Sequence, residues 1–204
     1  FDAVRGELRL TIPRRASERQ ALAWVKDQQG WIAGQVARDE GPIAVTAGVS
    51  LPGRGTLRRV DWDAGRARKV VDDGAALMLG GPAETVGPRI GRWLKAEALA
   101  LLDAESRTIA AAHDIAIAKV AVGDPRSRWG SCAADGRLRY SWRLIMAPDA
   151  VRRATVAHEV AHRVHMHHGP EFHTLVDVLN GAPVAGARRW LKANGRELHR
   201  YRFG

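Results

Sequence analysis

Six of the eight histidines in this 204-residue sequence fall between His158 and His173. Two of them, His158 and His162, flank Glu159 in an HExxH pattern. On a helix, residues four apart share one face with Cβ atoms about 5–6 Å apart, so both imidazoles can reach one Zn²⁺. Glu159 would then face the metal-bound water, which is where a general base belongs. The spacing therefore predicts a hydrolytic zinc site.

A third protein ligand is expected, because catalytic zinc usually takes three and leaves the fourth position for water. His168 lies six residues after His162, which on an unbroken helix would be about 9 Å further along the axis. The helix must therefore end between them, and the chain must turn back after Val164. We expect His167 to take a left-handed conformation in this turn. We expect Gly169–Pro170 to keep the helix from resuming at once.

Other side chains near the motif have alternative roles. Surface solvation is the default state of three histidines that could compete for the metal: His165, His167 and His173. Cys132 could be a ligand or nucleophile, but without an evident base beside it a small buried thiol is the better interpretation. Asp177 could accept a hydrogen bond from a ligand imidazole, whereas Glu197 lies too far downstream to be an attractive ligand. Five side chains remain open as stabilisers of the reaction's oxyanion: His165, His167, His173, Tyr140 and Arg143.

The HExxH residues need a buried helix to hold them. Seven apolar residues surround the two histidines: Val151, Ala154, Val156, Ala157, Val160, Ala161 and Val164. Such a nearly continuous apolar pattern is typical of a buried helix, and Pro148-Asp149 is a plausible start for it. A buried polar pair in such a helix needs a partner, which favours metal binding over histidines satisfied by hydrogen bonds alone.

Three segments in order resemble the YgjP-like metallopeptidases: Arg128–Cys132 (RWGSC), Trp142–Pro148 and His158–Phe172. A weaker similarity extends to Leu8–Trp31. The resemblance implies a zincin-like fold and kinship with SprT-like and WLM zinc peptidases. Carried over by position, it implies that His158, His162 and His168 bind zinc and that Glu159 is catalytic. Four positions depart from the family pattern and affect the turn and substrate contacts more than the metal: Ser141, His167, Gly169 and His173.

Composition narrows the class of protein. With 46% hydrophobic residues, the chain can bury the core of one domain or two small lobes. No apolar run is long enough to span a membrane, and the single Cys132 excludes an internal disulfide framework. We therefore expect a cytoplasmic protein, with a longer native N-terminus before Phe1. The net charge of +10 makes nucleic-acid contact possible, but the arginines are scattered and do not indicate it.

The N-terminal part reads as mostly β-structure. Alternating polar and apolar residues predict a strand over Glu7–Ile12, and Ser17 should open a helix. Short strands are expected at Thr56–Trp62, Arg68–Val71 and Ala75–Leu79, the first two separated by a turn at Asp63–Gly65.

The C-terminal part carries the motifs. A long helix should follow Pro88, and strands over Ile115–Val122 and Arg137–Ile145 should flank the Arg128–Cys132 loop. By resemblance, this hairpin is the candidate for pairing with an extended substrate. Helices are expected from Phe172 and over Val184–Asn194, the second capped by Gly195.

Taken together, these patterns predict an α+β fold with a zincin-like core, in which an active-site helix packs on a small sheet, and an N-terminal β-rich lobe. The predicted domains are 1–82 and 83–204. The predicted function is a Zn²⁺-dependent metallopeptidase that hydrolyses peptide or protein substrates by a zinc-bound water activated by Glu159. One alternative is a protease acting on DNA-bound proteins. Another is a non-catalytic zinc-stabilised module, closed by Cys132 or His173 as a fourth ligand.

Overall fold

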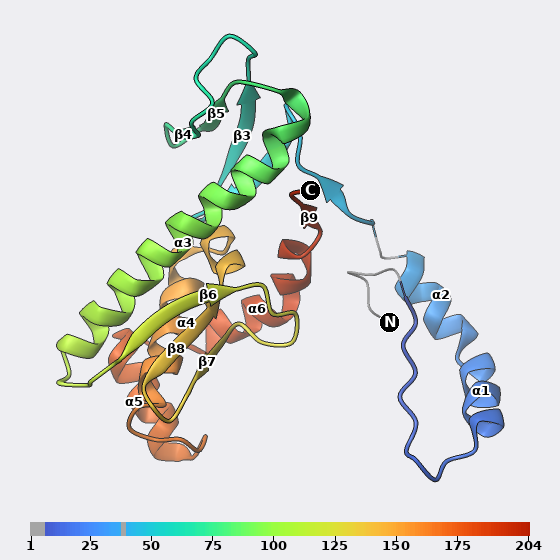
Figure 1. The fold of residues 1–204 in the computed structure, drawn as a ribbon. Coiled ribbons are helices and arrows are strands. Elements are labelled where there is room, and N and C mark those ends of the chain that lie inside the picture. Colours follow the sequence, from blue (N-terminus) through green and yellow to red (C-terminus); the bar gives the residue numbers. More distant parts are fainter. Residues whose placement is uncertain (1–6, 38–39) are drawn as a thin grey trace. The chain divides into compact units, whose positions relative to one another are not determined.

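We describe residues 7–37 and 40–204 in a computed structural model of the chain (Figure 1). The chain divides into two compact units, Phe1–Ile43 and Ala44–Gly204. The domain boundary expected at residue 82 stays a prediction. Helices and small sheets are mixed in the second unit, so the fold is α+β, as predicted.

The first unit contains two helices, α1 (Glu18–Asp27) and α2 (Gln29–Ala37). The Ser17 side chain accepts a hydrogen bond from the Gln20 N–H at 3.4 Å, which confirms the predicted helix start. The strand expected over Glu7–Ile12 is wrong. Only Glu7 makes a β-bridge, and the residues that follow form no ladder in the described part of the chain. Alternation of side chains predicts a strand only where a partner strand is available.

The two-residue strand β1 (Ile43–Ala44) contains the boundary between the units. The second unit then has a four-stranded sheet in the order β2-β3-β5-β4. The sheet consists of four short strands: β2 (Ser50–Gly53), β3 (Thr56–Trp62), β4 (Val71–Asp72) and β5 (Ala76–Leu79). The strands predicted over Thr56–Trp62 and Ala75–Leu79 are therefore confirmed as β3 and β5. The strand predicted over Arg68–Val71 lies later in the chain, at Val71–Asp72. The Asp63 carboxylate accepts a hydrogen bond from the Gly65 N–H at 2.9 Å, which confirms the predicted turn.

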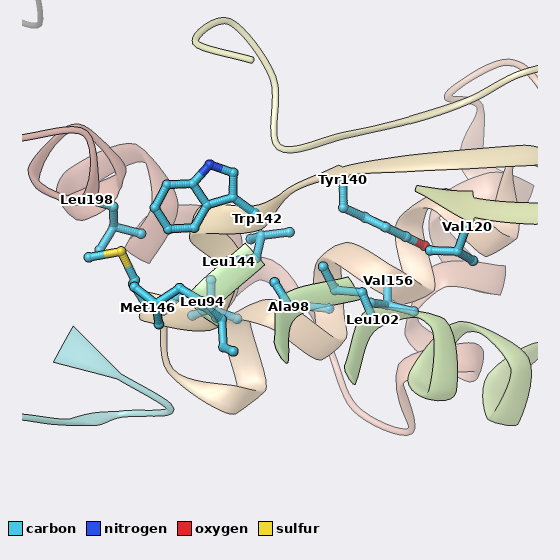
Figure 2. Packing of buried hydrophobic residues seen from close by; sticks show 14 of the residues in the cluster. Leu94, Ala98, Leu102, Val120, Tyr140, Trp142, Leu144, Met146, Val156 and Leu198 are labelled. Carbon is cyan, nitrogen blue, oxygen red and sulfur yellow. The ribbon is translucent and has the colours of Figure 1, made fainter. Parts of the chain in front are cut away.

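A 3-10 turn, η1 (Ala83–Thr85), leads into the long helix α3 (Val86–Ala111). Its buried face includes Leu94, Ala98 and Leu102, which lie beside Leu144 and Val156 in the core (Figure 2). This face confirms the amphipathic helix predicted after Pro88. It forms the support on which the motif-bearing elements pack.

A second sheet has the order β6-β8-β7, with β6 (Lys119–Gly123) parallel and β7 (Gly130–Cys132) antiparallel to β8 (Arg137–Ser141). The strand expected to run to Ile145 ends at Ser141 and continues as a 3-10 helix, η2 (Trp142–Met146). The Ser141 hydroxyl accepts a hydrogen bond from the Arg143 N–H at 3.3 Å. This local bond competes with the β-ladder and turns the chain into the core.

Three helices complete the unit: α4 (Asp149–Ala161), α5 (Pro170–Asn180) and α6 (Ala185–Leu198), followed by β9 (Tyr201–Arg202). The predicted start of α4 at Pro148-Asp149 is confirmed. Gly195 does not cap α6, because the helix runs on to Leu198. A Cβ at Gly195 would lie 2.7 Å from a ring atom of Trp129, so glycine there serves close packing. Within the described residues, no helix is both long and apolar enough to cross a membrane.

Candidate metal centre

Three histidines converge where α4 ends. The helix stops at Ala161, His162 forms its C-cap, and the chain reverses so that His168 approaches from the loop before α5. Ligand nitrogens of His158, His162 and His168 all lie within 4.8 Å of one another. The Nε2 atoms of His158 and His168 are 3.2 Å apart. The predicted reversal of the chain therefore takes place, and it creates a group that could bind a metal ion.

The geometry of the reversal differs from the prediction. His167 is not left-handed, since Arg54 and Asp114 are the non-glycine residues with positive φ in the described part of the chain. Gly169 is extended, with φ −76° and ψ 177°, and Pro170 occupies the start of α5. Gly169–Pro170 therefore begins a helix and does not delay one. The fixed φ of proline suits the first helical position, where no N–H partner is needed.

Contacts around the three histidines orient their rings. The Nδ1 of His162 lies 3.1 Å from the carbonyl oxygen of His165, which leaves its Nε2 for a ligand. The buried ring of Phe172 lies beneath all three imidazoles, with centroid separations of 4.5, 4.7 and 4.9 Å. Asp177 does not take the predicted orienting role, because its carboxylate accepts a hydrogen bond from the Val184 N–H at 3.0 Å. This hydrogen bond instead links α5 to Val184, the residue before α6.

Two of the three histidines have lowered pKa values. Burial, together with the charge that His162 and His168 carry when protonated, lowers the pKa of His158 to about 4. Burial also lowers the pKa of His162. Neutral imidazole is the form that binds metals, so the lowered pKa values of His158 and His162 favour the metal-binding form of these two side chains.

Glu159 is 5% exposed, yet its carboxylate has neither a hydrogen bond nor an ion pair within the described residues. Burial raises its pKa to about 7, and the charge of Arg128 opposes this rise. The backbone of β7 comes very close, because a Cβ on Gly130 would lie 2.5 Å from the Glu159 Oε1 atom. The glycine is therefore required for the carboxylate to reach this position.

A cavity of about 320 Å³ opens beside Glu159. Residues of α4, of β7 and the two positions before it, and of α6 and the position before it line this cavity. They are Arg128, Trp129, Gly130, Ala154, Thr155, His158, Glu159, Val184, Ala187, Arg188 and Leu191. The sequence analysis did not assign functional roles to Arg128, Gly130 or Arg188. Arg128 and Gly130 belong to the RWGSC motif, so that motif was the available signal for them. For Arg188 the sequence carried no such signal.

Two of the predicted oxyanion stabilisers are committed elsewhere. Tyr140 is fully buried, and its hydroxyl lies 3.0 Å from that of Ser106. Arg143 is buried against Asp124, with an Nε–Oδ1 distance of 2.7 Å, and also donates to the Leu198 carbonyl at 2.7 Å. Both side chains therefore hold the core and the C-terminal segment together.

The remaining candidate ligands do not join the three histidines. The His173 Nδ1 lies 3.1 Å from a nitrogen of Arg188. The Cys132 thiol is partly buried, donates to the Ala133 carbonyl at 3.5 Å, and has its pKa raised chiefly by burial. Glu197 pairs with Arg200 at 2.7 Å. The interpretation of Cys132 as a packing thiol is therefore consistent with the structure.

Comparison with known proteins connects this geometry to a family. No curated protein and no solved structure showed significant similarity to the chain. The family model described as YgjP-like, metallopeptidase domain, matches residues 2–194, which is nearly the whole sequence. A metal ion and peptide or protein substrates are what such a family implies, and the three histidines could bind the ion. The chain belongs to the YgjP-like metallopeptidase family.

Proposed function

We propose that this protein is a zinc-dependent peptidase whose metal ligands are His158, His162 and His168 and whose general base is Glu159. One observation carries the proposal. Three histidine nitrogens lie within 4.8 Å of one another beside a buried carboxylate for which the described residues provide no partner. A structural site would be expected to satisfy its buried charge.

The donor set favours zinc and an open coordination position. Imidazole nitrogen is a usual zinc ligand, and three protein ligands are typical of catalytic sites, whereas structural sites are closed by four. In the described part of the chain the group has these three members. His173 and Cys132, the candidates for closing it, make other contacts. This supports an enzyme over a zinc-stabilised binding module.

Glu159 supplies the proton transfers. A bound zinc ion supplies a Lewis acid that polarises the scissile carbonyl and lowers the pKa of water. The Glu159 carboxylate takes one proton from the attacking water and delivers it to the departing amine, so it is regenerated in each cycle. In the metal-free protein, burial raises the pKa of Glu159 to about 7, so this carboxylate already exchanges a proton near neutral pH before any metal binds.

The edge strand β7 is suited to hold the substrate. It pairs with β8 on one side only. Hydrogen bonds from the Ser141 N–H to the Trp129 carbonyl and from the Ala133 N–H to the Arg137 carbonyl mark two bonded positions of the ladder. By alternation, the backbone groups of Gly130 and Cys132 face away from β8. An extended peptide adding to this edge would lie directly beside Glu159.

Arg128 is the best-placed cation for the developing oxyanion. It is exposed, lines the cavity, and is the charged group that acts on the pKa of Glu159. Unlike Arg143, it makes no ion pair within the described residues. We therefore assign oxyanion stabilisation to Arg128 and not to Tyr140 or Arg143.

Glu159→Gln tests the proposal. This variant should retain zinc and lose hydrolysis of an unstructured protein substrate by at least about 100-fold, because the amide cannot accept the proton. Zinc content by atomic absorption and cleavage by mass spectrometry would be measured together. Cleavage at the wild-type rate by zinc-loaded Glu159→Gln would show that the proposed mechanism is wrong.

A further inference from the structure

The cavity beside Glu159 is large enough to hold a bulky side chain. Its volume of about 320 Å³ lies at the lower end of the roughly 300–1,000 Å³ usual for small-molecule sites. Its lining includes His158, which belongs to the three-histidine group, and Glu159. A peptide held along β7 would therefore have this cavity next to its reacting bond.

The wall of the cavity is apolar. Five of its side chains are hydrocarbon or indole: Trp129, Ala154, Val184, Ala187 and Leu191. The hydroxyl of Thr155 already donates to the Val151 carbonyl at 3.0 Å. Besides Glu159 and His158, the charged groups that line the cavity are the exposed guanidinium groups of Arg128 and Arg188. A charged side chain placed against the five apolar side chains would lose water without gaining a hydrogen bond from them. A carboxylate would instead be drawn to the exposed guanidinium groups of Arg128 and Arg188, away from the apolar wall.

Close packing fixes the shape of this wall. A Cβ at Gly195 would lie 2.7 Å from the Trp129 ring, so the indole rests directly on the backbone of α6. The Trp129 ring also lies 5.4 Å from the ring of His199, centroid to centroid. Ala187, on the same helix, contributes only a methyl group, which leaves the space open. The cavity is thus preformed and does not depend on a substrate to open it.

We propose that this cavity is the specificity subsite for the residue next to the scissile bond, and that it accepts a large apolar side chain such as Leu or Phe. This inference rests on the proposed peptidase function, whose site it deepens. The apolar wall selects for hydrocarbon, and the positive charges of Arg128 and Arg188 select against Lys and Arg side chains. Ala187 is the specificity-determining residue, because its small size sets the depth.

Binding can be measured without hydrolysis. Zinc-loaded Glu159→Gln would be titrated calorimetrically with N-acetylated, C-amidated hexa-alanine peptides that carry Leu, Phe, Asp or Lys at the third position. The Leu and Phe peptides should bind at least about tenfold more tightly than the Asp and Lys peptides, because burial of such a side chain is favourable. Equal affinities, or no detectable binding of any peptide, would overturn the inference.

Filling the cavity should abolish the preference. In the same background, Ala187→Trp should bring the Leu-to-Asp affinity ratio close to one. Ala193→Trp, on an exposed position of the same helix, should leave the ratio unchanged. Ala187→Leu, a smaller change, should retain Leu binding better than Phe binding and guards against misfolding of the Trp variant. A Leu preference that survives Ala187→Trp in folded protein would contradict the assignment.

The two ideas fail separately. If wild-type protein cleaves no peptide but the binding preference and its loss in Ala187→Trp are observed, the cavity stands as a binding site for an apolar side chain and the peptidase function fails. If wild-type protein cleaves peptides without any preference for apolar residues at one position, the function stands and the subsite fails.

Discussion

Each end of helix α4 holds a buried charged side chain, and the two differ in whether the described residues provide an ion-pair partner. Near its start, Arg152 is 3% exposed and is fully paired. Its guanidinium donates to Glu105 of α3 at 2.8 and 3.0 Å and to Asp149 at 2.5 Å. Two turns later, Glu159 is 5% exposed and has no such partner within the described residues. One helix thus holds a charge that supports the fold and a charge left available for chemistry.

This difference separates structural from functional polarity. Breaking a buried pair leaves a desolvated charge, so Arg152 and Glu105 are expected to matter for stability. An unpaired buried carboxylate costs stability, and proteins retain such a cost where a reaction requires it. The contrast predicts that changes at one end of α4 alter folding and that changes at the other alter metal binding and hydrolysis.

Removing a proposed metal ligand should have the largest effect. His162→Ala should weaken zinc binding by more than about 100-fold, beyond the roughly 10–100-fold cost of losing an outer partner, and should abolish hydrolysis. Competition with a chromophoric chelator measures the affinity. His167→Ala, in the same loop but outside the three-histidine group, is the matched control. Zinc binding by His162→Ala at wild-type strength would remove the basis of the comparison.

Arg152→Ala should destabilise the metal-free fold by about 3–5 kcal/mol, because Glu105 would be left without its partner. Urea unfolding followed by circular dichroism measures this free energy. Arg153→Ala changes the exposed neighbour and should alter stability by no more than about 0.5 kcal/mol. If both variants unfold at the same urea concentration, the paired end of α4 does not have the structural role assigned to it.

The raised pKa of Glu159 should make the free energy of unfolding fall as pH rises, whereas a paired carboxylate makes it rise with pH. Its pKa is raised to about 7 when folded, so the folded state binds more protons than the unfolded state between about pH 4.5 and 7. Stability from this group is therefore lost as pH rises through that window, by about 2–3 kcal/mol. Metal-free Glu159→Gln should lack this loss. The difference between variant and wild-type unfolding free energies, measured from pH 4 to 8, isolates the group from the histidines, and a constant difference would contradict the prediction.

Gly130→Ala should give the smallest effect and the sharpest geometric test. The new methyl would lie 2.5 Å from the Glu159 Oε1 atom, so the carboxylate must move, and hydrolysis should fall by about tenfold. Zinc affinity should stay unchanged because no histidine is touched. Gly186→Ala, where nothing lies within 4 Å of the new Cβ, should keep full activity. Steady-state kinetics on one peptide would compare the two.

The sequence predicts best what is local and periodic. The apolar pattern around His158 predicted α4 and its start at Asp149, and the six-residue spacing to His168 required the chain to reverse. The dihedral angles of that reversal were not predictable from residue type. His167 was a reasonable choice for positive φ, yet the turn is made without it.

Non-local features were the least predictable. Arg143 was a candidate for stabilising the oxyanion and lay within the strand predicted over Arg137–Ile145. Ser141 ends that strand, and Arg143 instead binds Asp124 and the Leu198 carbonyl. The cavity is likewise made by α6 meeting α4 and β7. Its lining residues are as much as 63 positions apart in the sequence, from Arg128 to Leu191, and no spacing rule brings them together.

Phe172 has a consequence for how the protein acquires its ion. Because its ring underlies all three imidazoles and belongs to α5, the ligand-bearing loop is held from both ends by the hydrophobic core. The conformational entropy of the three histidine side chains is therefore lost during folding and not when the metal ion binds. Such a preformed site can bind a scarce cation without first having to become ordered around it.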